Sequence, residues 1–202
     1  MKRVIILIAI ALIGYAIYWF KFRKTDEGPQ EPKQEALKTK RHSDAFNNSF
    51  DTLMNHYFAV KAAFVDADTA KAKLATKEFL STVEKLDTAE LKKDSAVFTT
   101  IITQLADVKM NAESLQKQTD ITEMRQDFRM VSESIYPLLK TIHYEGKTLY
   151  WQNCPMAFGD GKEANWISNT EEIINPYLGK NHPEYKGTML HCGEVKDSIK
   201  AQ

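Results

Sequence analysis

Glycine and proline are absent from residues 33–136 of this chain. Both residues interrupt helices, so a stretch that lacks them favours long, continuous helices. Residues 150–195 show the opposite composition, because five of the eight glycines and three of the six prolines fall there. The sequence therefore predicts a long helical body that is followed by a compact, turn-rich cap.

Net charge is also absent, since 27 basic residues balance 27 acidic ones. A nucleic-acid-binding protein would show a basic excess, so we expect no nucleic-acid partner. The helical part contains no Glu-x-x-His pair, which excludes a di-iron carboxylate bundle. The chain shows no nucleophile–base pattern, phosphate-binding loop or paired carboxylates at a turn, and we expect that it is not an enzyme.

Cysteine is scarce, and both examples, Cys154 and Cys192, lie in the cap. The chain has no Cys-x-x-Cys motif, which argues against thioredoxin-like exchange. An isolated pair in an exported protein usually forms a disulfide, and closing this loop would stabilise the fold by about 4 kcal/mol. The alternative is a pair of free thiols that are available to bind a metal ion.

One long apolar run occurs, from Val4 to Phe20, and basic residues flank it on both sides. As a helix it would span about 25 Å, at the short end for a bilayer core. Tyr18 and Trp19 near its end suit an interfacial aromatic belt. We expect residues 1–24 to form an uncleaved signal-anchor in the inner membrane, with the C-terminal part in the periplasm. A cleaved signal peptide is the alternative.

Residues 25–43 are polar, carry charges of both signs and contain almost nothing apolar, which predicts a disordered linker. From residue 44 to residue 146 the apolar residues recur every three or four positions, as they do in amphipathic helices. Asp87 with Glu90, and Asp120 with Glu123, have the spacing of capping boxes and mark two helix starts.

The predicted fold is mainly α, with an antiparallel four-helix bundle over residues 44–146. Residues 147–202 are expected to form a small, irregular, Cys-containing cap that packs on the bundle. The best-phased apolar positions should form its core: Phe50, Leu53, Tyr57, Phe98, Ile101, Leu105, Phe128, Val131 and Ile135.

The candidate metal ligands of the cap lie next to its cysteines. Met156 follows Cys154 by two positions, Met189 precedes Cys192 by three, and His191 adjoins Cys192. Thiolate, thioether and imidazole ligands together select copper(I) or silver(I) over hard cations. If the disulfide forms, Met156, Met189 and His191 remain as a three-ligand set. If it does not form, both cysteines can join them.

Four strings of the C-terminal half resemble a bacterial family of domains of unknown function. They are Tyr150-Trp151-x-x-Cys154-Pro155-Met156-Ala157, Ala164-Asn165-Trp166-Ile167-Ser168, Ile174-Asn175-Pro176-Tyr177-x-Gly179 and Met189-x-x-Cys192-Gly193-Glu194. That family occurs alone in exported proteins, and fused to periplasmic adaptor subunits of Cus-type heavy-metal efflux pumps. The resemblance covers roughly residues 45–200 and implies a helical domain with a link to copper or silver handling.

These observations favour a membrane-tethered periplasmic accessory domain that binds copper(I) or silver(I) and serves metal efflux or homeostasis. Its expected partners are the inner membrane and a heavy-metal efflux adaptor or another envelope protein. The alternative is an interaction module of the cell envelope that binds no metal. In that case the disulfide of the cap is purely structural.

Overall fold

The computed structural model describes residues 12–19, 21 and 41–201 of the chain. The chain divides into two units, with the boundary after Lys38. In the first unit the described residues 12–19 and 21 are helical, and the remainder of the predicted signal-anchor lies outside the described residues. No helix in the described part of the chain is long and apolar enough to cross a membrane.

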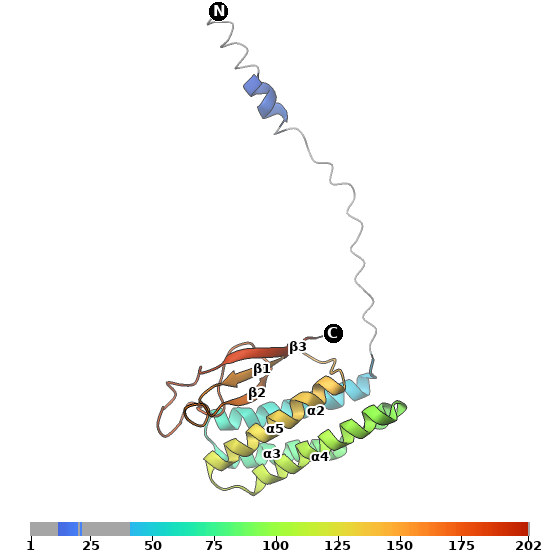
Figure 1. Ribbon diagram of the computed structural model, residues 1–202, viewed down its shortest axis with the longest axis vertical. Helices are drawn as coiled ribbons and strands as arrows, with labels where there is room; N and C mark the ends of the chain where they lie inside the picture. The colour runs from blue at the N-terminus through green and yellow to red at the C-terminus, as the bar shows by residue number, and fades with distance from the viewer. Residues whose placement is uncertain (1–11, 20, 22–40, 202) are drawn as a thin grey trace, which may run out of the picture. The chain divides into compact units, whose positions relative to one another are not determined.

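The second unit is mainly helical (Figure 1). Residues 41–201 contain four α-helices, one short 3-10 helix and three strands. The helices are α2 (Asp44–Val65), α3 (Thr69–Lys85), η1 (Ala89–Lys93), α4 (Ser95–Lys117) and α5 (Ile121–Thr141). The strands are β1 (Leu149–Cys154), β2 (Ala164–Ser168) and β3 (Glu194–Ile199).

Each α-helix of this unit begins at a side chain that accepts a hydrogen bond from a free backbone N–H of the first turn. These N-cap residues are Ser43, Asp68, Asp94 and Asp120. Asp120 accepts from the amides of Thr122 and Glu123, as its spacing to Glu123 predicts.

The helix start predicted at Asp87 is wrong. The Asp87 carboxylate accepts from the amide of Ala89, but the segment that follows is the 3-10 helix η1. The α-helix begins at Ser95, where the Asp94 carboxylate accepts from the amides of Ala96 and Val97. Asp87 and Asp94, seven positions apart, each have a carboxylate that can cap a helix. Hydrogen bonds between Glu90 and the side chains of His42 and Ser43 stabilise the short 3-10 helix that follows Asp87.

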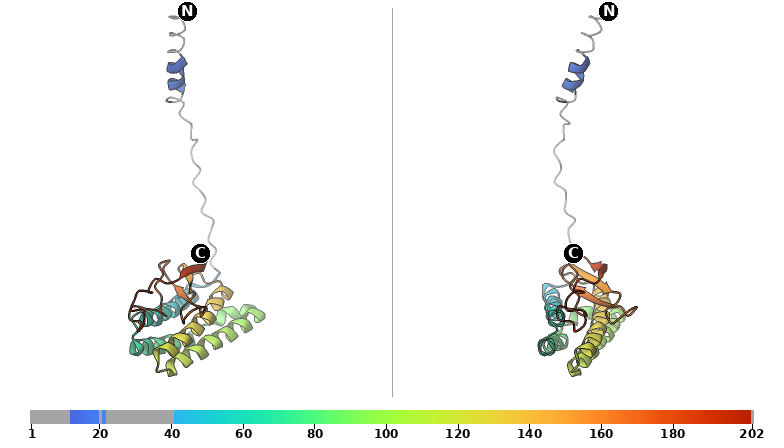
Figure 2. Two further views of the ribbon diagram at one scale, coloured as in Figure 1. Left: turned by 60° about the vertical axis from the view of Figure 1, so that its left-hand side comes forward. Right: turned by 90° about the vertical axis from the view of Figure 1, so that its left-hand side faces the viewer.

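The helices pack in two layers, with α2 and α5 next to the sheet and α3 and α4 on the far side (Figures 1 and 2). Tyr57 on α2 stacks on Phe128 of α5, with ring centroids 5.3 Å apart, and approaches Phe79 of α3 at 6.4 Å. Seven of the nine predicted core residues are buried, whereas Phe98 and Leu105 are half-buried. Both lie in the first half of α4, where Ile101 is the one buried residue.

The cap contains a three-stranded antiparallel sheet in the order β2-β1-β3, which corrects the prediction of an irregular cap. Trp151 of β1 pairs with Ile167 on one side and with Asp197 on the other. The central strand is buried at its start and over its last three residues, so it lacks the alternation that marks a half-exposed strand. Pairing with β3, which begins 40 positions after β1 ends, has no local signal.

The sheet and the helices share one continuous hydrophobic core. The Tyr57 hydroxyl accepts from the backbone amide of Ile167 at 3.0 Å and shares a hydrogen bond of 2.7 Å with Ser132. Tyr136 of α5 stacks flat on Trp151, with ring centroids 4.2 Å apart. The cap is therefore part of the same folded unit as the helices.

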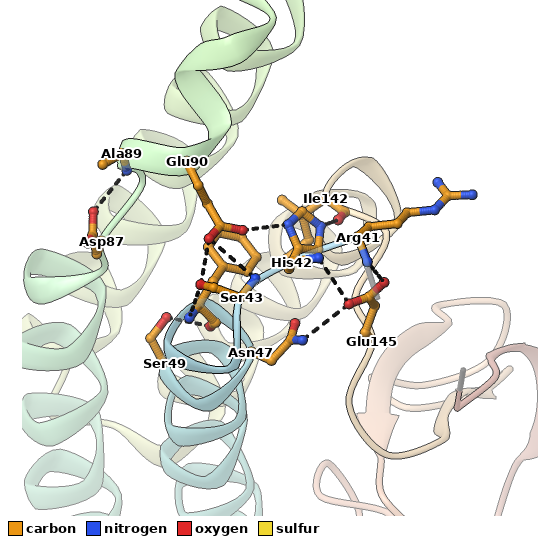
Figure 3. Close-up of polar contacts among 11 residues, drawn as sticks. Arg41, His42, Ser43, Asn47, Ser49, Asp87, Ala89, Glu90, Ile142 and Glu145 are labelled. Atoms are coloured by element: carbon orange, nitrogen blue, oxygen red, sulfur yellow. Dashed lines mark hydrogen bonds and ion pairs between the residues drawn. The ribbon is translucent and has the colours of Figure 1, made fainter. Parts of the chain in front are cut away.

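A polar cluster around His42 holds the chain where it enters α2 (Figure 3). The His42 Nδ1 lies 2.8 Å from Glu90 of η1, and its Nε2 lies 2.6 Å from the carbonyl oxygen of Ile142 after α5. Glu145 accepts from the backbone amides of Arg41 and His42. These bonds join the start of α2 to two connections that are far away in the sequence.

Candidate functional site

Cys154 and Cys192 form a disulfide, with their Cα atoms 5.8 Å apart. The bond joins the end of β1 to the residue two positions before β3. Gly193 follows with φ +144°, and a Cβ atom there would lie only 2.6 Å from the carbonyl oxygen of Asn153. The predicted disulfide is confirmed, and in this state neither cysteine offers a thiolate to a metal ion.

The other three predicted ligands lie in different surroundings. Met156 and Met189 are half-buried side chains that pack against the hydrophobic core. His191 is exposed, and its Nδ1 lies 2.8 Å from the carbonyl oxygen of Ile173. Within the described residues, no group of three or more His, Cys, Asp and Glu side chains is placed to hold a metal ion. The copper(I) or silver(I) prediction therefore has no support from the described side chains.

A pocket of about 320 Å³ opens between the first turns of α5 and two loops of the cap, residues 157–159 and 177–185. Its polar lining includes Thr122, Arg125, Gln126, His182, Glu184 and Tyr185. Its apolar lining includes Ala157, Phe158, Leu178 and Pro183. A concave site of this size with a few converging polar groups is the usual form of a small-molecule site.

Arg125 is one of the residues that line this pocket, and only 3% of its surface is exposed. Its Nε donates to the carbonyl oxygen of Pro176 at 3.2 Å, and its Nη2 donates to that of Phe64 at 3.1 Å. The Phe64 carbonyl belongs to the last turn of α2, where the helix dipole favours a cation. Arg125 thus has a structural role, because it joins α2, α5 and the cap.

The charge of Arg125 nevertheless lacks a carboxylate partner in the part of the chain that the structure describes. In the same described part, Nη1 of Arg125 has no hydrogen-bond partner and is accessible to solvent. Burial lowers the pKa of Arg125 to about 10, so the guanidinium stays charged at neutral pH. The pocket therefore holds a buried positive charge with donor capacity to spare.

His182 supplies a second donor to the pocket. Its Nδ1 accepts from the backbone amides of Glu184 and Tyr185, each at 3.3 Å, and its ring stacks on Tyr185. Burial and then the charge of Arg125 lower the pKa of His182, so the neutral ring carries its hydrogen on Nε2. Glu184, the carboxylate of the pocket lining, is exposed, and water screens its charge.

Asn175 holds the loop of residues 175–179, which carries Leu178 of the apolar pocket lining. Its Oδ1 accepts from the amides of Tyr177 and Leu178 at 2.8 and 3.0 Å, and its Nδ2 donates to the carbonyl oxygen of Cys192 at 2.8 Å. Gly179 follows, and a Cβ atom there would lie 2.6 Å from the carbonyl oxygen of Val65. The Asn-Pro-Tyr-x-Gly string therefore connects the pocket wall to the disulfide and to the end of α2.

The sequence analysis missed Arg125, although a signal was present. Arg125 lies four positions after Ile121 and three before Phe128, on the apolar face of the predicted helix. A charged residue in an apolar stripe is either buried with that stripe or extends its side chain to solvent. Arg125 is buried. His182 and Tyr185 had no comparable signal, because they lie in a loop.

Residues 53–147 match the model of a family described as "Protein of unknown function (DUF3347)". The match covers just under half of the chain, from Leu53 in α2 to the loop before β1. It agrees with the expected resemblance to an uncharacterised domain, but it includes neither the cysteine strings of the cap nor an efflux adaptor. Comparison with curated proteins and with solved structures gives no match.

Proposed function

We propose that this chain is a binding domain for a small organic anion, which it holds in the pocket around Arg125. The observation that carries the proposal is the buried guanidinium of Arg125, which lines a pocket and has no carboxylate partner in the described residues. Burying an unpaired charge is costly, and an anionic ligand would offset that cost. His182 lines the same pocket, and the hydrogen on its Nε2 makes it a second, neutral donor in the proposal.

The chemistry of the lining favours an organic acid over an inorganic anion. A guanidinium binds carboxylate and phosphate groups through parallel N–H donors. Phe158 and Leu178 offer an apolar surface beside it, which suits a hydrocarbon or aromatic body. A volume of about 320 Å³ accommodates a molecule of the size of a substituted benzoic acid.

The proposed place of action is an oxidising compartment, because the disulfide closes the cap that carries nine of the twelve residues that line the pocket. A periplasmic location with an inner-membrane anchor at residues 1–24 is part of the proposal and rests on the sequence. The pocket offers binding groups, and we propose a binding role and no catalysis. An envelope protein, such as an efflux adaptor, is the proposed partner.

Copper(I) or silver(I) binding remains a separate proposal from the sequence, with Met156, Met189 and His191 as ligands. The disulfide brings the two methionine-bearing segments together, since the Cα atoms of Cys154 and Cys192 are 5.8 Å apart. Silver(I) titration of the oxidised full chain tests it, with Met156→Ala combined with Met189→Ala as the variant. His143→Ala is the control. Affinity weaker than about micromolar for the wild-type chain, oxidised or reduced, would refute it.

Isothermal titration of the oxidised full chain with benzoate tests the anion proposal. Gln126 is exposed and lines the pocket, so Gln126→Glu should weaken benzoate binding about three- to tenfold without affecting the fold. Gln126→Lys should strengthen it, and added salt should reduce both effects. Thr103→Glu, on an exposed part of α4, is the matched control for the added charge.

Two results would overturn the proposal. The first is that benzoate binds the wild-type chain no more tightly than about 1 mM. The second is that Gln126→Glu and Thr103→Glu have the same effect on affinity, which would place the anion elsewhere.

A further inference from the structure

A second cavity, of about 540 Å³, lies next to the pocket of Arg125. The two share Gln126 and Phe158 in their linings. The second is also lined by Arg129, which follows Arg125 by one helical turn of α5. Residues four apart on a helix lie on one face, with Cβ atoms about 6 Å apart. Two arginines therefore face two adjoining cavities, with Phe158 between them.

Arg129 resembles Arg125 in lacking a carboxylate partner within the described residues. Its Nε is buried without a hydrogen-bond partner, and its Nη2 lies 3.8 Å from the sulfur of Met130. A thioether is a weak acceptor and leaves the charge uncompensated. The second cavity is thus also lined by an arginine without a carboxylate partner in the described residues, although Arg129 is half-buried where Arg125 is buried.

Two carboxylates also line the second cavity, but both have donors from the protein. Asp127 accepts from Ser114 at 2.8 Å and from Gln118 at 3.0 Å, both on the side of α4. Glu163 accepts from Asn153 at 3.2 Å. These acids are engaged with polar neighbours, while the two guanidinium groups keep unused donors.

We infer that the ligand is a small dianion, with its two acidic groups about one helical turn apart and an apolar spacer that lies against Phe158. This inference rests on the proposed anion-binding function and names the class of its ligand. One acidic group accepts a hydrogen bond from Nη1 of Arg125, and the other binds the guanidinium of Arg129. Organic dicarboxylates with a rigid or extended spacer have this form.

Terephthalate, benzoate and monomethyl terephthalate form a matched set of probes, because they share a ring and differ in the second carboxylate. Titrated into the oxidised full chain, terephthalate should bind about tenfold more tightly than either monoanion. Arg129→Gln should remove that advantage, because it should weaken terephthalate binding more than it weakens benzoate binding. Arg129→Lys should retain part of it, and Lys162→Glu, at an exposed residue of the same cavity, should reduce it.

The outcomes separate the two proposals. Equal affinities for the three probes, with benzoate still sensitive to Gln126→Glu, overturn the dianion inference and leave the anion pocket standing. Arg129→Gln that weakens benzoate and terephthalate equally also overturns the dianion inference. Failure of all three probes to bind overturns both.

Discussion

His42 Nδ1 lies 2.8 Å from a carboxylate oxygen of Glu90, across 48 positions of sequence. The two side chains are 12% and 24% exposed, so water only partly screens the pair. The opposite ring nitrogen lies 2.6 Å from the carbonyl oxygen of Ile142. Glu90 also accepts from the Ser43 hydroxyl at 2.6 Å. One carboxylate thus fixes the N-cap of α2 and the chain segment before it.

We predict that Glu90→Gln lowers the free energy of unfolding by about 1–2 kcal/mol at pH 7, because it weakens charge-assisted hydrogen bonds. Burial acts to raise the pKa of Glu90, but hydrogen bonds from Ser43 and His42 outweigh it and hold the pKa below its ordinary value. A carboxylate with a lowered pKa stabilises the fold above about pH 4.5 and loses that contribution as the pH falls through its folded pKa. Urea unfolding should therefore show a smaller difference between wild type and variant at pH 3.5 than at pH 7.

Glu78→Gln, on an exposed part of α3, is the matched control and should change stability by less than about 0.5 kcal/mol. Equal effects of the two substitutions would show that the His42 cluster contributes no specific stability.

Lys61→Met should stabilise the protein. Lys61 is 8% exposed, its Nζ donates to the Ser168 hydroxyl at 3.0 Å, and burial lowers its pKa to about 8. Methionine keeps the length of the side chain and removes a buried charge, which should raise the free energy of unfolding at pH 7 by about 1–3 kcal/mol.

Lys61 should also make the stability of the wild-type protein depend on pH. Between about pH 8 and pH 10.4 the unfolded chain binds more protons at this lysine, so wild-type stability gains from it as the pH rises. The advantage of the methionine variant should narrow over this window in chemical denaturation. Lys77→Met, at an exposed position of α3, should show no such narrowing. A methionine variant less stable than wild type at pH 7 would contradict the prediction.

Benzoate binding should strengthen as the pH falls below about 6.5. Burial and the charge of Arg125 disfavour the protonated form of His182, and Glu184 partly opposes them. A bound anion offsets the charge of Arg125, so His182 takes up a proton on binding and affinity rises with proton concentration. Titrations at pH 5.5 and pH 8 measure the change. His182→Gln should bind benzoate with little pH dependence in this range, and an unchanged pH profile in that variant would assign the effect to another group.

Replacing both cysteines, Cys154→Ser with Cys192→Ser, should lower the free energy of unfolding by about 4 kcal/mol, because the closed loop is long. The same change should weaken benzoate binding, since Asn175 links the carbonyl of Cys192 to the backbone of Leu178 in the pocket wall. Thermal unfolding and titration measure the two effects. A reductant should reproduce them in wild type and should do nothing more to the double variant. Unchanged benzoate affinity would separate the pocket from the disulfide.

The sequence by itself determined the features whose signals lie within a few residues. Apolar spacing predicted the helical body, and the carboxylate of Asp120 begins α5 as its distance from Glu123 indicates. The scarcity of cysteine predicted the disulfide, because two cysteines leave one possible pairing. These features are local or have a single solution, and no knowledge of the packing is needed to state them.

The tertiary structure alone decided the sheet, the start of α4 and the pocket. Strands β1 and β3 pair across 39 intervening residues, and no local pattern encodes such a partner. Arg125 meets the carbonyl oxygens of Phe64 and Pro176, which are 61 and 51 positions away. A buried charge needs polar partners, and those of Arg125 are distant backbone carbonyl groups. The position of Arg125 in the helix pattern indicates that it is buried, but it does not identify these partners. These two carbonyl groups come from separate segments, and only the folded chain brings them to Arg125.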